Sequence, residues 1–407
     1  MEKQHAWPEG HWNWPIRISH KHGVRCGEMI HVGGQVDLTP EGVVRHPDDL
    51  KRQTAEVMKY LSRVLEELGT DLADLVRLRC FYVNDGGGDE DGFLEMVAAA
   101  LPEGARPAVT AIPVPYLAYD GMMVEIEAIA MRGRDNARMA RVYAPAEGLS
   151  PLPGPFAHAV RCGRMIYTSG QSPRDAEGRI TDPGDLVAQT RSVMAQQAKA
   201  LGAFGAGFGD VVKINRWYGG QGGLEDFEPA ALACAAHFQE PGPAATGIPI
   251  PRHAWDGMRL KIETVAMLGE DGNYLEREHA WPEGHWDWHV HLPYKHGLKC
   301  GEMIFLGGQV SIDQKGCAID PWQLAEQTRS SMENIRSILE LFGAGYDDVV
   351  KVLTLYHGDC GPDTLNANLS IRASCFTDPD PATTGVPMPE LAYPGMMVEI
   401  DIDAMKG

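Results

Sequence analysis

Hydrophobic and polar positions along the chain alternate between short strand patterns and one long helical pattern. The segment Met29-Ile30-His31-Val32 is apolar and β-branched, which is typical of a strand. Further along, apolar residues spaced by three and four predict a helix of about 20 residues. In the last third of the chain these residues are Leu324, Met332, Ile335, Ile338, Leu339 and Phe342, and Gly343 and Gly345 follow as helix terminators. A proline stands where each such helix is expected to begin (Pro47, Pro183, Pro321).

Four more elements complete the pattern. A second strand is predicted over residues 76–83, a shorter helix over 91–101 and a closing pair of strands, of which 122–131 is the clearer. The order is strand, strand, long helix, strand, short helix, strand, strand. This order indicates an α+β unit with helices on one face of a mixed sheet.

The whole pattern occurs three times in the chain. Gly27, Gly163 and Gly301 each begin a Gly-x-Met-Ile motif that leads to Gly-Gly-Gln or Ser-Gly-Gln, with a Gln-Thr pair 26 residues after the glycine and a Pro-x-Pro element ending 88 residues after it. Constant spacing in three copies indicates three copies of one fold. We therefore expect domains at 1–134, 135–272 and 273–407. Each sheet has a second face to bury, so we expect the units to close around a pseudo-threefold axis as a single-chain pseudo-trimer.

The amino-acid composition limits the kinds of partner and the cellular compartment that we expect. A net charge of -20 argues against a nucleic-acid partner, because phosphate binding needs a basic face. Of eight cysteines, only Cys26, Cys162 and Cys300 share a repeat position, and no disulfide framework is evident. The first residues lack the apolar core of a signal peptide, and no stretch is apolar enough for a membrane span. We expect a cytoplasmic protein without a membrane partner.

Three motifs carry a family resemblance: Gly163-Arg164-Met165-Ile166-Tyr167-Thr168-Ser169-Gly170-Gln171, the Ala-Gln-Thr-Arg of residues 188–191, and the Val-Glu-Ile-Glu-Ala-Ile-Ala of residues 124–130. With these motifs, each unit resembles the RidA/YjgF family of imine and enamine deaminases, and the resemblance covers nearly the whole chain. It implies three chorismate-mutase-like α+β domains. It also implies active sites in the clefts between them, because members of the family form homotrimers with sites between subunits.

The resemblance implies four site positions, which the copies fill differently. An arginine that binds the substrate carboxylate falls at Arg106, where the other copies have Gly242 and Asp380. A glutamate on the last strand falls at Glu125 and Glu399, with Lys261 in copy two. A tyrosine position holds His20, Phe156 and Tyr294, and a serine position holds Gly33, Ser169 and Gly307.

Only copy one keeps both the arginine and the glutamate. Arg106 can bind a carboxylate through two parallel hydrogen bonds, and Glu125 can act as a base toward water or as a proton relay. The neighbour that completes this cleft is either copy two, with Phe156 and Ser169, or copy three, with Tyr294 and Gly307. A four-residue excess before the glutamate, near Tyr119, sets each copy apart from the family pattern.

Several other residues have open roles. The arm His-Ala-Trp-Pro-Glu-Gly-His-Trp-x-Trp starts at His5 and again at His279, and it can act as a lid or as a packing staple. We expect no metal and no cofactor, because the histidines and aspartate of the second arm (His285, Asp287, His289, His291) have no matching set in the first. The three repeated cysteines are interpreted as packing residues, and Thr110, Thr246 and Thr384 as structural hydrogen-bonding residues at turns.

The leading functional hypothesis is hydrolysis of a small imine or enamine acid to an oxo acid and ammonia, centred on Arg106 and Glu125. The loss of the arginine in two copies favours an alternative, a non-catalytic small-molecule sensor or stabilising partner. The aromatic arms favour a third, a pathway-specific deaminase of an aromatic or ring-cleavage product. A ribonuclease activity is disfavoured by the acidic charge. We expect a monomer, with a higher homo-oligomer as the alternative.

Overall fold

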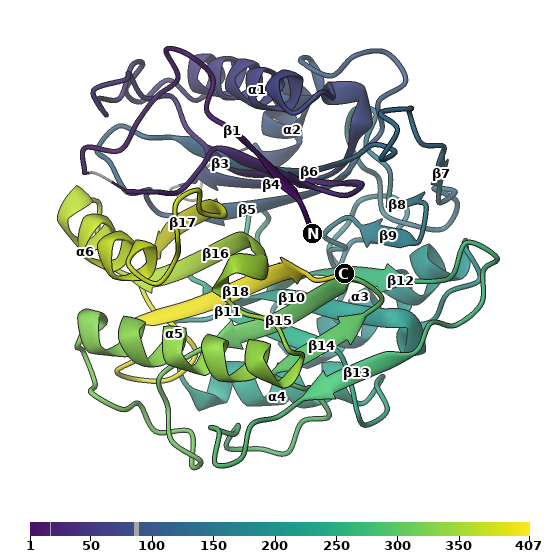
Figure 1. The fold of residues 1–407 in the computed structure, drawn as a ribbon. Coiled ribbons are helices and arrows are strands. Elements are labelled where there is room, and N and C mark those ends of the chain that lie inside the picture. Colours follow the sequence, from purple (N-terminus) through teal and green to yellow (C-terminus); the bar gives the residue numbers. More distant parts are fainter. Residues whose placement is uncertain (17, 85–88) are drawn as a thin grey trace.

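A computed structural model describes residues 1–16, 18–84 and 89–407 of the chain. It contains three six-stranded sheets, one for each repeat (Figure 1). In domain 1 the sheet order is β1-β2-β3-β6-β4-β5, with β4 and β5 parallel and the other neighbours antiparallel. The elements are β1 (Lys3–Ala6), β2 (Gly23–Cys26), β3 (Met29–Gln35), α1 (Leu50–Glu67), the 3-10 turn Leu72–Asp74, β4 (Leu75–Val83), α2 (Glu90–Ala98), β5 (Ala108–Val114) and β6 (Val124–Met131).

Domains 2 and 3 repeat this topology. Domain 2 has β7 (Arg141–Tyr143), β8 (Ala159–Cys162), β9 (Met165–Thr168), α3 (Leu186–Gly202), the 3-10 turn Phe208–Asp210, β10 (Val211–Gly219), α4 (Leu224–Ala235), β11 (Ala244–Ile250) and β12 (Leu260–Met267). Domain 3 has β13 (Arg277–Ala280), β14 (Gly297–Cys300), β15 (Met303–Gln309), α5 (Leu324–Leu341), the 3-10 turn Tyr346–Asp348, β16 (Val349–His357), α6 (Pro362–Ala373), β17 (Ala382–Met388) and β18 (Val398–Met405). The segments 132–140 and 268–276 connect the three sheets, so we propose domain boundaries within them, at 134/135 and 272/273.

Two details differ from the sequence prediction. The expected arm contributes an edge strand to each sheet (β1, β7, β13), including domain 2, where the aromatic arm motif is missing. The expectation that each proline begins its helix was wrong. The helix α1 begins at Leu50, and the side chain of Asp49 caps it by accepting from the Arg52 N–H, so Pro47 lies in the preceding turn.

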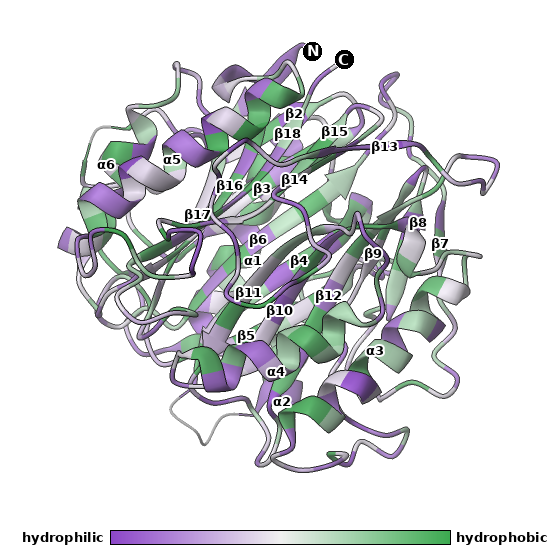
Figure 2. Ribbon diagram, turned by 90° about the horizontal axis from the view of Figure 1, so that it is seen from below, coloured by the Kyte–Doolittle hydropathy of each residue, from purple (hydrophilic) through white to green (hydrophobic). Residues whose placement is uncertain are grey.

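The three units close into a ring with helices outside and sheets inside. The contacts run from β5 to β9, from β11 to β15 and from β17 to β3, so each domain contacts both others. Figure 2 shows α3, α5 and α6 toward the outside, with strands such as β6, β10 and β12 between them. One buried apolar cluster contains residues of all three domains, including Cys26, Cys162 and Cys300. The expected pseudo-trimer, with the second face of each sheet buried at its centre, is confirmed.

Buried charges join the domains around this ring in one direction. The Arg79 guanidinium of domain 1 donates to Glu263 of domain 2 with Nε–Oε1 at 2.8 Å, and the Lys351 ammonium of domain 3 lies 2.8 Å from Glu127 of domain 1. Lys213 of domain 2 pairs with Asp401 and Asp403 of domain 3 (2.7 Å to Asp403), and these side chains are nearly inaccessible to solvent. Because a buried charge without a partner costs several kcal/mol, each pair requires its neighbour domain to be in place.

The repeated threonines strengthen the same ring. The hydroxyls of Thr110, Thr246 and Thr384 donate to Glu263, Asp401 and Glu127 of the next domain. They lie within the parallel strands β5, β11 and β17 rather than at turns, so the sequence-based interpretation was right about a structural hydrogen bond and wrong about its place.

No helix in the described part of the chain is both long and apolar enough to cross a bilayer.

Replacing Glu127 by glutamine tests the ring of charges. The change keeps the shape of the side chain but leaves the buried Lys351 and Arg79 without one carboxylate charge, so we expect a loss of about 3 kcal/mol in the free energy of unfolding. The measurement is the urea unfolding curve. The matched control is Glu333→Gln in the exposed pair with Arg336, expected to cost less than about 1 kcal/mol. Equal small losses in both variants would contradict the proposed role of the ring.

Candidate active sites

The four site positions implied by the sequence meet at three surfaces between domains, which we name seam 1/2, seam 2/3 and seam 3/1. At each seam one domain supplies the arginine position and the next domain supplies the other three. Seam 1/2 therefore combines Arg106 with Phe156, Ser169 and Lys261; seam 2/3 combines Gly242 with Tyr294, Gly307 and Glu399; and seam 3/1 combines Asp380 with His20, Gly33 and Glu125. None of the seams contains the complete expected set.

Arg106 and Glu125 lie at different seams, so the structure does not bring this expected pair together. Arg106 is exposed, and its guanidinium carbon lies 4.9 Å from the ring centroid of Tyr143 in domain 2. The neighbour at Arg106 is domain 2, because the N–H of Ala157 donates to the carbonyl of Pro107. A catalytic role of Arg106 stays a prediction. In such a role Arg106 would act without Glu125, which lies at another seam.

Two cavities lie at the other seams. The cavity at seam 2/3, called cleft 2/3, is lined by Glu399 of β18 and Arg216 of β10, with Trp286, Tyr294 and Tyr393 among its walls. The side chain of Arg216 is 2% exposed, and its Nε and Nη1 find no hydrogen-bond partner among the described residues. Its guanidinium carbon lies 5.2 Å from the ring centroid of Phe227. Cleft 2/3 therefore contains a buried cation with free donors.

The cavity at seam 3/1, called cleft 3/1, has the same plan with a different arginine. Glu125 of β6 lines it together with Arg372 of α6, which is fully buried. Arg372 donates from Nε to Asn368 at 2.7 Å and from Nη1 to Thr383 at 3.1 Å, and its Nη2 lacks a partner among the described residues. Burial lowers the pKa of Arg372 to about 10, so it remains a cation at neutral pH.

The carboxyl group in each cleft is protonated at neutral pH. Burial raises the pKa of Glu125 and of Glu399 from 4.5 to about 8, although a backbone N–H (of Gly385 and Gly247, respectively) donates to each. Each carboxyl lies against a glycine of the Gly-Gly-Gln motif. A Cβ on Gly34 would lie 1.8 Å from an oxygen of Glu125, and one on Gly308 would lie 1.9 Å from Glu399. These glycines are needed because they make room for the glutamates.

Buried hydroxyls without partners gather at the same two seams. Tyr294 and Tyr393 line cleft 2/3 with Tyr218 near Glu399, and Tyr119 lines cleft 3/1 with Tyr356 near Glu125. The hydroxyls of Tyr218, Tyr119 and Tyr356 find no hydrogen-bond partner among the described residues, whereas the Tyr294 hydroxyl contacts the Cys234 thiol and the Tyr393 hydroxyl contacts the backbone of His289. Folded proteins satisfy most buried polar groups, so such a cluster around a cavity indicates a site for a polar ligand or for water.

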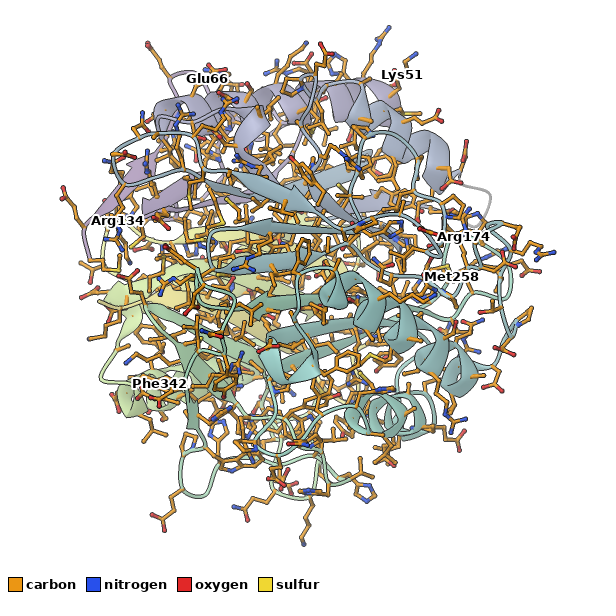
Figure 3. All side chains as sticks on the ribbon, turned by 90° about the vertical axis from the view of Figure 1, so that its right-hand side faces the viewer. Lys51, Glu66, Arg134, Arg174, Met258 and Phe342 are labelled. Atoms are coloured by element: carbon orange, nitrogen blue, oxygen red, sulfur yellow. The ribbon has the colours of Figure 1, made fainter. Side chains whose placement is uncertain are left out.

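Seam 1/2 satisfies the equivalent groups internally. Lys261, at the glutamate position, forms an ion pair with Glu90 and donates to the carbonyl of Ala111 at 2.7 Å. The hydroxyl of Tyr82, the counterpart of Tyr218, donates to Glu90 at 3.0 Å. The Ser169 hydroxyl accepts from the Val109 N–H and donates to the Ala157 carbonyl. Nearby, Arg174 lies between domains 1 and 2, 3.4 Å from Asp91 (Figure 3).

The other residues at the tyrosine and serine positions have mainly packing roles. His20 is fully buried beside Phe376, and burial holds its pKa well below the ordinary value. It is not part of the lining of cleft 3/1, whereas its counterpart Tyr294 lines cleft 2/3. Phe156 packs into the apolar core of domain 1. A Cβ on Gly33 or Gly307 would lie 2.5 Å from a carbonyl oxygen of the neighbouring domain, so close backbone approach requires glycine there.

The aromatic arms fold identically and serve two purposes. In domain 1 the rings of Trp14 and His22 stack at 5.4 Å, and the side chains of His11 and Trp12 bond to Gln35. The second arm repeats these contacts with Trp288, His296, His285, Trp286 and Gln309. These stacks fix each arm on its own domain, and both tryptophans then form a wall of the cleft. These contacts show packing within a domain, in the same residues that enclose each cavity, and they are not the staple across a domain border that the sequence led us to expect.

The histidines of the second arm bond to separate groups. His285 bonds to Gln309, His289 lies 2.8 Å from Glu228 and His291 lies 3.3 Å from Glu240. No group of three or more metal-binding side chains is found in the described ranges. Burial raises the pKa of the three central cysteine thiols, which fits the packing role assigned to them.

Sequence reasoning missed Arg216 and Arg372. Their counterparts in the other copies are Cys80 and Thr354 for Arg216, and Ala98 and Cys234 for Arg372. A signal was present, because an arginine between Ile214 and Tyr218 occupies an inward position of a central strand. The resemblance directed attention to the family position instead, and only the fold shows that two different elements reach equivalent cavities.

Comparison with known proteins agrees with this architecture. The family model described as Endoribonuclease L-PSP matches residues 16–132, 150–268 and 289–406. The chain belongs to this family. The resemblance to the RidA/YjgF family, which the three motifs indicated, is thereby confirmed for all three domains.

Individual relatives of the family match one domain of this chain. A RutC family protein of Pyrococcus horikoshii is 35% identical over 114 residues, which cover 28% of this chain and 87% of the relative. A 2-iminobutanoate/2-iminopropanoate deaminase of Salmonella typhimurium is 30% identical over 113 residues, covering 28% of this chain and 85% of that protein. A crystal structure of a chorismatase aligns with a TM-score of 0.53 at 13% identity, over 82% of this chain and 93% of that chain, and this likeness concerns the fold.

The two buried glutamates predict a pH-dependent stability. Because the folded state keeps protons that the unfolded chain releases, the stabilisation is complete below pH 4.5 and is lost as the pH rises through about 8. Replacing Glu125 and Glu399 by glutamine removes this effect. As the pH rises from 4.5 to 8.5, we expect the free energy of unfolding of the wild type to fall relative to that of the double variant by about 2 kcal/mol or more.

Urea unfolding curves at several pH values measure this difference. Glu103→Gln, in an exposed turn, serves as the control, and its curve should follow the wild type at every pH. Parallel pH profiles for the double variant and the wild type would show that the two carboxyls titrate normally.

Proposed function

We propose that clefts 2/3 and 3/1 are two active sites that hydrolyse small imine or enamine carboxylic acids to oxo acids and ammonia. The observation that carries the proposal is the meeting of a buried arginine with a protonated glutamate in both cavities. Membership of the family and the printed names of its deaminase relatives support the same chemistry.

The arginine would bind the substrate carboxylate. Arg216 and Arg372 are almost inaccessible to solvent, and in a buried site a charge-assisted hydrogen bond to a carboxylate is stronger than in water. The substrate carboxylate would also neutralise the buried charge of the arginine, which lacks an ionised carboxylate partner within its cavity. The neutral form of Glu399 or Glu125 favours substrate binding, because a second negative charge in the cleft would repel the substrate carboxylate.

The glutamate would then move the proton. Its carboxyl protonates the imine nitrogen, or the β-carbon of an enamine, which makes the C=N carbon electrophilic. The resulting carboxylate accepts a proton from the attacking water as the C–O bond forms. It returns that proton to the nitrogen of the tetrahedral intermediate. As the C–N bond breaks and ammonia leaves, the hydroxyl proton of the intermediate passes to the glutamate carboxylate, which gives the oxo acid and restores the protonated carboxyl. A pKa near 8 suits a group that must both donate and accept near neutral pH.

Substrate entry requires the clefts to widen. Each cavity has a volume of about 30 Å³, enough for about two water molecules and too small for such an acid. The half-buried Trp14 and Trp288 form part of the wall of each cleft, and we propose that they move aside on binding. The arms would then act as lids as well as packing elements.

Removing the arginines tests the proposal. Since two sites work in parallel, Arg216→Ala or Arg372→Ala alone should leave part of the activity, and the double variant should lose about a hundredfold in kcat/KM. The measurement is ammonia release from imines generated in situ by an amino-acid oxidase.

Arg106→Ala separates this proposal from the prediction based on the family position. A hundredfold loss in that single variant, with little change in the double variant, would move the active site to seam 1/2. If carboxylates raise the melting temperature of the wild type without any turnover, the sensor hypothesis replaces the enzyme.

A further inference from the structure

The two clefts have one wall built from equivalent residues and an opposite wall that differs. Domains 1 and 3 supply matching residues, such as Trp12 and Trp286, Tyr119 and Tyr393, or Met122 and Met396, each pair in equivalent positions. The opposite wall comes from domain 3 in cleft 3/1 and from domain 2 in cleft 2/3, and its residues differ in chemical type. We propose that this difference gives the clefts different substrates, an inference that rests on the function proposed above.

The arginines differ in how many donors they leave free. Arg372 has Nε and Nη1 bonded to Asn368 and Thr383, so one guanidinium nitrogen remains. Arg216 keeps both Nε and Nη1 free of hydrogen bonds to the described residues and is held only by aromatic rings, those of Phe227 and of Tyr294 at 5.9 Å. Arg216 therefore has more N–H groups available for a carboxylate than Arg372, whose Nε and one N–H of Nη1 are already bonded.

The hydroxyl groups follow the same division. Tyr294 and Tyr393 line cleft 2/3, whereas cleft 3/1 has Tyr119, the counterpart of Tyr393, in its lining. The counterpart of Tyr294 in domain 1, His20, is not among the lining residues of cleft 3/1. The additional phenol of Tyr294 beside the Arg216 guanidinium suits a ligand with a second anionic group.

Aliphatic surface distinguishes cleft 3/1. Leu365 and Leu369 of α6 line it, where the equivalent residues of α4 are Phe227 and Ala231. Branched apolar side chains pack against branched apolar substrates, and transferring such a group from water is worth about 2 kcal/mol. Cleft 3/1 therefore takes a monocarboxylic acid with a branched aliphatic side chain, and cleft 2/3 an acid with a second carboxylate.

Binding of two stable oxo acids tests this assignment. 2-Oxoglutarate and 4-methyl-2-oxopentanoate match the expected products and cannot be turned over as imines. Isothermal titration of the full chain should give one tight site for each. Arg216→Ala should weaken 2-oxoglutarate at least about tenfold and change the branched acid less than twofold; Arg372→Ala should do the reverse. Arg191→Ala, an exposed arginine on α3, is the matched control.

Two milder variants keep the test decisive if an arginine variant does not fold. Tyr294→Phe retains the ring and should weaken only 2-oxoglutarate, by about fivefold. Leu365→Phe should weaken only the branched acid. Opposite selectivity in these four variants supports the inference.

Equal loss of both acids in every variant, or two equal sites for each acid, would overturn the inference and leave the proposed function intact. Absence of binding by either acid, together with absence of ammonia release, would overturn the proposed function as well. Ammonia release without binding of either oxo acid would overturn only the assignment of substrates.

Discussion

The ring of buried charges between the domains is the constraint on which the rest of the structure depends. Each domain places a cation from its β4-type strand against a carboxylate on the last strand of the next domain, as in Lys351 with Glu127. Apolar packing alone would hold three sheets together without fixing how they meet. Because an ion buried without its partner is strongly disfavoured, removing one partner of a pair would destabilise the seam in which it lies. The clefts lie at these same seams.

Within this ring the three seams have diverged in a way that a homotrimer cannot. A homotrimer must place the same residues at every interface, whereas a single chain can alter each one separately. Seam 1/2 has exchanged its glutamate for Lys261, which pairs with Glu90, and its polar groups satisfy one another. Seams 2/3 and 3/1 keep the glutamate and gain an arginine from β10 or from α6. Closure of one seam and opening of the other two are therefore alternative solutions on one scaffold.

Local sequence rules explain many features outside these two clefts. Helix α1 is capped, the Gly-Gly-Gln glycines lie where backbone or carboxyl oxygens approach, and the central cysteines pack in apolar surroundings. Buried polar atoms without partners occur in several parts of the described chain, for example at His31 and His253. What distinguishes the two clefts is that an arginine with unbonded nitrogens and a neutral carboxyl group line the same cavity.

The sequence by itself determined the threefold repeat, the order of elements in each unit, the family and the burial of a second sheet face. These follow from periodicity and spacing, which are local properties of the chain. It also identified Glu125, Glu399 and the aromatic arms as notable. Only the tertiary structure decided that Arg106 and Glu125 belong to different seams, and that Arg216 and Arg372 take the place beside the glutamates. The reason is geometric: residues that share a seam come from different domains, and a strand and a helix can deliver the same cation to equivalent cavities from unrelated positions in sequence.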